Sequence, residues 1–267
     1  MIGQMESGAI HLGFNPERLE SFIPHVVTIL YYVFPPEGGE RKQSVGSGVL
    51  FQVGANVWLV TAGHVVKDLR DWNALGRLSH VRLCDSWRDS EGVADPIYLP
   101  VKDVDPSAWV KIGTDEEPPD LGAIKLQNNL VDQLKAGRVE IIEARHWTNI
   151  PQQLDFYKLL GSPGQLTNET EVGLAMFRLE KISRPEAARK TDFDRFYGQL
   201  FTNQERQPGG VDIEKIEGVS GGPIIGFKEL GNGSAYWIVA IQSTWFAESK
   251  IVTADYYLPL LQHLESL

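Results

Sequence analysis

Short runs of β-branched and aromatic residues recur along this chain and constrain its fold more than any other feature. Residues 26–34 form such a run, which ends at Pro35 and Pro36. Residues 45–53 and 57–61 form two more, separated by Gly54-Ala55-Asn56, a pattern typical of a hairpin. Many short strands with few helical signals predict an all-β barrel or sandwich.

Helical patterns are short. Residues 65–69 predict a single turn and residues 131–136 predict a short helix. Near the C-terminus the apolar residues are spaced for one face of a helix, at Tyr257, Leu260, Leu261 and Leu264. We therefore expect the chain to end in a short helix.

The composition excludes several classes of protein. The 267 residues carry 35 acidic and 25 basic side chains, a net charge of −10, which argues against binding to nucleic acid or to an anionic membrane. The one cysteine, Cys84, cannot form an intrachain disulfide. A reducing compartment suits such a chain, so a cytoplasmic location is predicted.

Targeting and cofactor signals are missing from the sequence. Residues 1–18 contain no basic region followed by an apolar core, so no signal peptide is expected. The best apolar run, residues 26–34, is short of the ~20 residues that span a bilayer. The six histidines form no i, i+4 pair, and no phosphate-binding glycine loop is present, so we expect neither a metal nor a cofactor.

One segment has the pattern of a nucleophile. Ser220 lies within Gly218-Val219-Ser220-Gly221-Gly222-Pro223, just before a short apolar run. A serine attacks a carbonyl only if the backbone projects its hydroxyl and aims amide N–H groups at the developing oxyanion. Glycines on both sides permit the tight turn that this requires.

Two upstream segments supply what such a serine lacks. His64, within Thr61-Ala62-Gly63-His64-Val65-Val66, follows a buried-looking strand and offers a general base. Asp120 precedes the apolar segment Leu121-Gly122-Ala123-Ile124 and offers a carboxylate to orient the base. By distance along the chain, Asp103, Asp105 and Asp115 are rivals for that role.

In the order His, Asp, Ser, these segments resemble the three signatures of trypsin-like (chymotrypsin-fold) serine peptidases. The flanking stretches agree, because residues 46–51 resemble the glycine-rich strand before the histidine and residues 237–243 the strand after the serine. The resemblance spans roughly residues 20–260. It implies two antiparallel six-stranded β-barrels with the active site between them, at residues 20–130 and 151–267, joined by a connection at 131–150.

The resemblance also implies a function, that of a serine endopeptidase acting on protein or peptide substrates through an acyl-enzyme. His64, Asp120 and Ser220 would form the catalytic triad, and the backbone N–H groups of Gly218 and Ser220 the oxyanion hole. Substrate specificity would fall to Glu214, Ser243 and Trp245. An acid at Glu214 would select Lys or Arg, whereas Trp245 would narrow the pocket and favour small side chains.

The chain departs from secreted zymogens at Val219, where they carry the aspartate that pairs with a new N-terminus after cleavage. Valine cannot form that ion pair, so activation by N-terminal cleavage is not expected. The alternatives are that the chain is competent as synthesised, or that a regulatory protein partner or a ligand switches it.

Two other functions fit the same motif. The chain could be a catalytically silent peptidase fold used as a binding module. Gly218-Val219-Ser220-Gly221-Gly222 also fits Gly-x-Ser-x-Gly, the nucleophile elbow of α/β-hydrolases, for which Asp255 and His263 complete the order Ser, Asp, His. That elbow needs a helix directly after the serine, and Gly221-Gly222-Pro223 is poor helix material.

Overall fold

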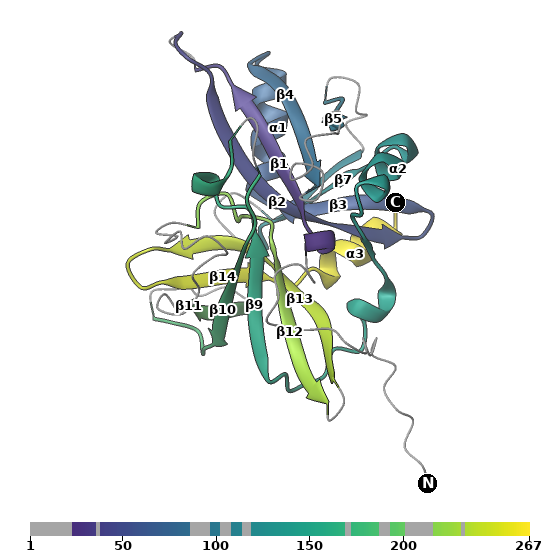
Figure 1. The fold of residues 1–267 in the computed structure, drawn as a ribbon, viewed down its shortest axis with the longest axis vertical. Coiled ribbons are helices and arrows are strands. Elements are labelled where there is room, and N and C mark those ends of the chain that lie inside the picture. The colour runs from purple at the N-terminus through teal and green to yellow at the C-terminus, as the bar shows by residue number, and fades with distance from the viewer. Residues whose placement is uncertain are drawn as a thin grey trace.

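The computed structural model describes residues 23–35, 38–85, 97–101, 108–113, 119–168, 172–186, 193–200, 216–230 and 233–267. Glu214 and residues 1–22 lie outside this part of the chain. Figure 1 shows two β units, one above the other, with the helix α3 (Leu258–Glu265) at their junction. The first unit comes from the N-terminal half of the chain and the second from the C-terminal half.

The first unit is an eight-stranded sheet. Seven strands follow the order β5-β4-β1-β2-β3-β7-β6, and each neighbouring pair is antiparallel. Their bounds are β1 Val27–Val33, β2 Lys42–Val53, β3 Asn56–Ala62, β4 Leu78–Asp85, β5 Ile97–Leu99, β6 Trp109–Ile112 and β7 Leu121–Lys125. The eighth strand, β8 (Ile141–Ile142), pairs with β2 in parallel.

The second unit is a closed barrel of six strands in the order β10-β11-β14-β13-β12-β9. Their bounds are β9 Phe156–Gly161, β10 Ala175–Lys181, β11 Arg195–Leu200, β12 Pro223–Leu230, β13 Gly233–Phe246 and β14 Ile251–Asp255. Closure pairs the unpaired edges of a sheet, so this unit has no exposed edge strand among its six. The predicted all-β fold with two β units is confirmed. The prediction of six strands holds for the second unit and is wrong for the first, which is an eight-stranded sheet because β5 pairs with β4 and β8 pairs with β2.

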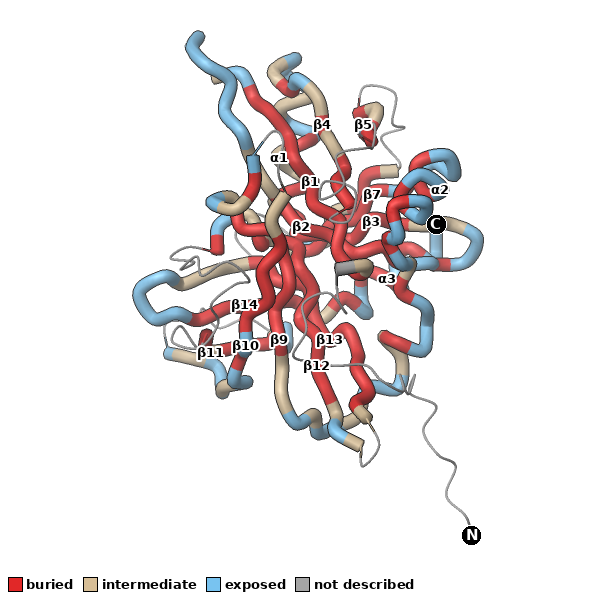
Figure 2. The backbone as a smooth tube through the Cα atoms, in the orientation of Figure 1, coloured by how far each residue is buried: buried red, intermediate tan, exposed pale blue. Residues whose placement is uncertain are grey.

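Three large apolar clusters of the described residues stabilise the two units. One fills the first sheet and is covered by the helices α1 (Gly63–Ala74) and α2 (Asn128–Ala136), and a second fills the barrel. The third lies between the units and includes Phe51 and Val60 from the first, Ile238 from the second and Leu260 and Leu261 from α3. Figure 2 shows the buried segments of both units meeting at the centre of the molecule. Burial of this interface fixes how the units sit against each other.

The helices are longer than the sequence patterns predict. The turn predicted over residues 65–69 is part of α1, a helix of 12 residues that already includes His64. The predicted helix at 131–136 begins three residues earlier, and its Leu130, Val131 and Leu134 pack into the core of the first sheet. Apolar contacts stabilise helices beyond what local propensity supports. The predicted C-terminal helix is confirmed as α3.

Within the described residues, no helix has both the length and the apolar character needed to cross a bilayer.

Candidate active site

His64 is the second residue of α1, and only Gly63 separates it from the end of β3. Its backbone N–H is one of the first N–H groups of the helix, which have no partner within the helix. Oδ1 of Asp120 accepts this N–H at 2.8 Å, and the carbonyl oxygen of Asp120 accepts the N–H of Gly63 at 3.0 Å. The N-cap residue Ala62 makes no side-chain cap, so the carboxylate of Asp120 caps α1 instead.

The other carboxylate oxygen of Asp120 orients the imidazole. Oδ2 lies 2.6 Å from Nδ1 of His64. When Nδ1–H donates to the carboxylate, Nε2 carries the lone pair and can accept a proton. The His64 side chain is 43% exposed and that of Asp120 21%, so solvent and substrate can reach the imidazole while the carboxylate stays largely covered.

The surrounding charges set the pKa of His64. Burial lowers this pKa, but the hydrogen bond and charge of Asp120, together with the charge of Asp68, outweigh burial and the net pKa is raised. Lys111 acts in the opposite sense. A raised pKa means that the protein stabilises the imidazolium, as a base that accepts a proton during a reaction requires.

Asp68 is a further candidate site residue that the sequence analysis missed. It lies one helical turn after His64 on α1, and such i, i+4 pairs share a face of a helix. Burial raises the pKa of the Asp68 carboxyl, while the charge of His64 and a hydrogen bond with the Tyr31 hydroxyl oppose that shift. The i, i+4 spacing from His64 could have identified it.

Ser220 sits in a turn framed by two glycines with positive φ, Gly218 at 94° and Gly221 at 89°. The Ser220 carbonyl accepts the N–H of Ser47 at 2.8 Å, and the N–H of Gly221 donates to the carbonyl of Gln242 at 2.8 Å. Those φ values strain any residue with a Cβ, so the glycines allow the turn.

The turn packs tightly against the first unit. A Cβ added to Gly221 would lie 2.0 Å from the carbonyl oxygen of Ser47, 2.1 Å from Oγ1 of Thr61 and 3.0 Å from the backbone nitrogen of Ala62. Thr61 and Ala62 are the last residues of β3, immediately before Gly63 and His64. The structure therefore brings the backbone of the Ser220 turn against the strand end from which His64 follows.

The peptide group before Gly218 has a defined orientation. Its carbonyl, from Glu217, accepts the N–H of Gly164 at 2.7 Å, and its other end is the N–H of Gly218. In a trans peptide the C=O and N–H point in opposite directions, so the Gly218 N–H faces away from Gly164. The carbonyl of Gly218 in turn accepts the hydroxyl of Ser47 at 3.1 Å.

Val219 is fully buried in the core of the barrel. A Cβ added to Gly161 would lie 2.6 Å from Cγ1 of Val219, so β9 approaches this side chain closely. The environment is apolar, as expected for a position that makes no ion pair.

The structure describes two of the three predicted specificity residues, Ser243 and Trp245. Glu214 lies outside the described residues. Ser243 is buried, and its hydroxyl accepts from Arg195 at 2.6 Å. Trp245 is half-buried, packs against the core of the barrel and lies opposite Val252 of β14. Substrate binding by these three residues stays a prediction.

The α/β-hydrolase alternative does not fit the fold. An α/β-hydrolase requires a parallel sheet with crossing helices, whereas both units here are built from antiparallel strands, apart from the short β8. Asp255 is buried and pairs with Arg195, while His263 lies on the exposed side of α3. We therefore discard the set Ser220, Asp255 and His263.

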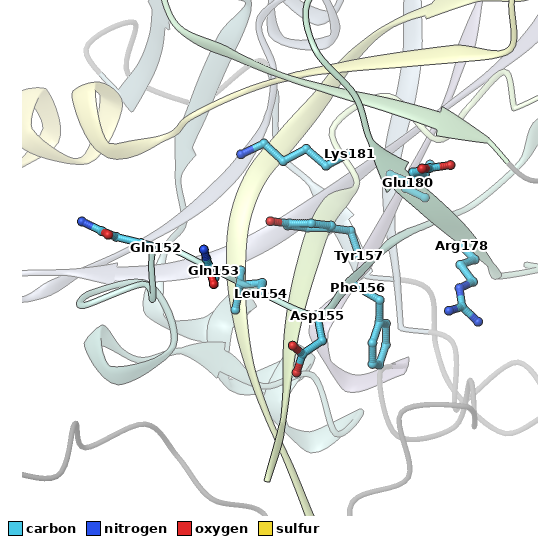
Figure 3. Close-up of a pocket in the computed structure, with 10 residues that line it drawn as sticks. Gln152, Gln153, Leu154, Asp155, Phe156, Tyr157, Arg178, Glu180 and Lys181 are labelled. Atoms are coloured by element: carbon cyan, nitrogen blue, oxygen red, sulfur yellow. The ribbon is translucent and has the colours of Figure 1, made fainter.

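The described residues also hold a large pocket away from the motifs. It has a volume of about 930 Å³ and is lined by residues 152–157 and 178–181 of β9, β10 and the segment before β9. Figure 3 shows its polar and aromatic side chains, including Tyr157, Glu180 and Lys181. None of the predicted site residues lines it. Among the described residues, no cluster of three or more His, Cys, Asp or Glu side chains is arranged to hold a metal ion.

Comparisons with known proteins extend this picture. No protein-family model matches the sequence, and no curated protein matches it. Among solved structures, the chain is similar to the thermostable serine protease AL20 from an extremophilic microorganism, with 14% identity over 91% of this chain and 96% of that one and a TM-score of 0.53. It is also similar to the protease Anisep from Arthrobacter nicotinovorans, with 14% identity and a TM-score of 0.51. That similarity covers 88% of this chain and 90% of Anisep.

At this level of identity the likeness concerns the fold, and it extends over nearly the whole length of all three chains. The recognition of this architecture from three short motifs is confirmed. The chain has the two-barrel fold of the trypsin-like (chymotrypsin-fold) serine proteases.

Proposed function

We propose that this protein is a serine endopeptidase that cleaves protein or peptide substrates through an acyl-enzyme. The observation that carries the proposal is the His64–Asp120 pair, with 2.6 Å between Nδ1 and Oδ2, at the strand end on which the Ser220 turn packs. A base oriented by a carboxylate, close to a serine in a glycine turn, is the arrangement that activates a hydroxyl nucleophile.

The first half of the proposed reaction forms the acyl-enzyme. Oγ of Ser220 attacks the carbonyl carbon of the scissile peptide while Nε2 of His64 takes the hydroxyl proton. The carbonyl electron pair moves onto oxygen, and the N–H groups of Gly218 and Ser220 donate to this oxyanion. The intermediate collapses, the C–N bond breaks, and His64 passes its proton to the leaving amine.

The second half of the reaction hydrolyses the acyl-enzyme and regenerates the free enzyme. A water molecule gives a proton to Nε2 of His64 and attacks the acyl carbon, and collapse of the second oxyanion releases the carboxylic acid product and restores the Ser220 hydroxyl with the proton from His64. The carboxylate of Asp120 stabilises the imidazolium that forms in each half. Every proton is thus carried by one imidazole.

The test compares three variants in peptide hydrolysis. Ser220→Ala and His64→Ala should lose nearly all activity, and by similar factors, because triad members act as a unit. The matched control is His263→Ala on the exposed side of α3, which should keep wild-type activity. If the wild type hydrolyses no peptide from a diverse library, the binding-module function replaces the endopeptidase.

The cellular setting is a separate proposal. Cys84 is buried in β4 and is the one cysteine of the chain. A protein that needs no disulfide suits a reducing compartment, so we place this protein in the cytoplasm. Fractionation of the native host, followed by detection of the full chain in the soluble cytosol, tests this; recovery from the medium would contradict it.

A further inference from the structure

A buried ion pair lies behind the candidate site. Arg195 of β11 and Asp255 of β14 are direct partners in the barrel ladder. Nε of Arg195 lies 2.7 Å from Oδ1 of Asp255, and Nη2 lies 3.0 Å from Oδ2. The side chains are 13% and 1% exposed. The Nη2–H group donates a hydrogen bond to Oδ2, while Nε and Oδ1 form a close ion-pair contact without hydrogen-bond geometry, and the two contacts together hold the carboxylate in place.

Asp255 also forms a hydrogen bond with the first unit. Oδ2 of Asp255 accepts the backbone N–H of Asp120 at 3.1 Å. Asp120 is then held at four points, because its carbonyl oxygen accepts from Gly63 and its two carboxylate oxygens contact the backbone N–H and the ring of His64. The bond from Asp255 is the one of these four that comes from the barrel carrying Ser220.

Arg195 also contacts β13, the strand that carries Ser243. Nη2 of Arg195 donates to the hydroxyl of Ser243 at 2.6 Å. Its neighbour Gln242 accepts the N–H of Gly221 and donates its own N–H to the carbonyl of Gly222. Arg195 therefore contacts both Asp255, which accepts the backbone N–H of Asp120, and β13, the strand to which the Ser220 turn is hydrogen-bonded.

The energetics point away from a purely structural role. Removing two charges from water is costly, and buried ion pairs are often replaceable by apolar residues with no loss of stability. Burial raises the pKa of the Asp255 carboxyl, which Arg195 and the N–H of Asp120 oppose. The pair provides a hydrogen-bond acceptor of fixed position for the backbone N–H of Asp120. Apolar residues could not provide this acceptor.

We propose that Arg195 and Asp255 are positioning residues of the catalytic site, which hold Asp120 in register with Ser220 across the junction of the two units. The proposal deepens the endopeptidase function and rests on it. Asp255 acts through the backbone of Asp120, and Arg195 acts through Asp255 and Ser243.

The first test follows the ring of His64 by NMR titration, which needs no substrate. Arg195→Met with Asp255→Val removes both charges and roughly keeps the volume of the pair, so the barrel should fold. Asp120 then loses its anchor, its contact with Nδ1 weakens, and the pKa of His64 should fall relative to wild type. In the control, Arg145→Gln with Glu143→Gln removes an exposed ion pair of 3.1 Å and should leave that pKa unchanged.

The second test is kinetic. The double variant should lower kcat by roughly tenfold to 10²-fold with little change in KM, since small displacements of catalytic groups cost this much. Arg195→Lys keeps the charge but loses the two-point contact and should retain more activity. In an Asp120→Ala background, the double variant should cost no further activity, because nothing remains to be positioned.

Three results would overturn the proposal. An unchanged His64 titration, beside the control, would show that the pair does not position Asp120. A rise in KM at constant kcat would make Arg195 a substrate-binding residue instead. A full loss added in the Asp120→Ala background would show a purely structural role. Inactivity of the wild type would instead count against the endopeptidase function and leave the titration interpretable.

Discussion

At the scale of single residues, the protonation of His64 controls the proposed chemistry. Asp120 and Asp68 raise its pKa, while burial and Lys111 lower it. The ring acts as a base only when neutral. kcat/KM should therefore rise with pH through this raised pKa, so the acidic limb of the profile should lie above the usual range of histidine, near 6.5.

Asp120→Asn and Asp68→Asn separate the charge of these acids from the contact with the ring. Each removes a charge that raises the pKa of His64, so each should move the acidic limb to lower pH. Only Asp120→Asn removes the acceptor for Nδ1 and should lower kcat, by about 10⁴ where the wrong tautomer results. Profiles of kcat/KM against pH measure both effects. If neither variant moves the acidic limb of the kcat/KM profile, His64 is not the titrating base.

Trp245 is the residue on which specificity depends most in this account. Its indole is half-buried against the core of the barrel, two residues beyond Ser243 on β13. We expect poor cleavage after Arg or Lys in the wild type and, in Trp245→Gly, a pocket open to larger side chains. Trp245→Phe, which keeps most of the bulk, is the matched control in a peptide-library profile. Strong wild-type cleavage after Arg that Glu214→Gln abolishes would refute the steric prediction.

At the scale of elements, the junction of β3 and α1 positions His64, the proposed general base. Gly63 lies between the strand and His64, and a Cβ there would lie 2.6 Å from Oδ1 of Asp120 and 3.1 Å from the backbone nitrogen of Leu121. The close approach lets one carboxylate cap the helix and orient the ring together. The strand-to-helix junction is thus part of the site.

Gly63→Ala should push the Asp120 carboxylate aside and lower kcat by about 10²-fold, as a displacement of about 1 Å can. Gly76→Ala is the control at the other end of α1, where φ is +65° and a Cβ would meet nothing within 4 Å. That change should cost about 1 kcal/mol of stability and leave kcat unchanged. Thermal unfolding and initial rates distinguish the two. Equal kcat values for both variants would contradict the role of the junction.

At the scale of the whole molecule, the candidate site lies where the two units meet. His64 and Asp120 come from the first unit and Ser220 from the second, and the Ser220 carbonyl and the Asp255 carboxylate each accept a backbone N–H from the first unit. The interface core that includes α3 fixes this arrangement. A site divided between two rigid units is preorganised only while their interface holds.

This arrangement leads to a prediction about activation. Val219 is buried among apolar side chains and offers no charge to a new α-amino group. Intact chain and chain trimmed within residues 1–22 should therefore give equal active-site titration with the same reagent. Reaction of the trimmed form alone, with its new α-amino group buried, would show zymogen-type activation instead.

Much of this could be predicted from the sequence, because local chemistry fixes it. Backbone geometry requires the glycines around Ser220 and the small residues before His64. Runs of β-branched residues, separated by turn residues, indicate the strands. The length of α1, the pairing of β8 with β2 and the contact of Asp255 with Asp120 could not be predicted. They depend on packing between segments far apart in the chain, such as the 135 residues that separate Asp120 from Asp255.

The most direct measurement is the covalent labelling of the wild-type chain with a fluorophosphonate, followed by mass spectrometry of its peptides. The reagent phosphonylates a serine only where a base and an oxyanion hole activate it. The account predicts one adduct per chain, on Ser220, formed faster as the pH rises through the pKa of His64. No adduct under conditions where the fold is intact, or an adduct on another serine such as Ser47 or Ser162, would contradict it.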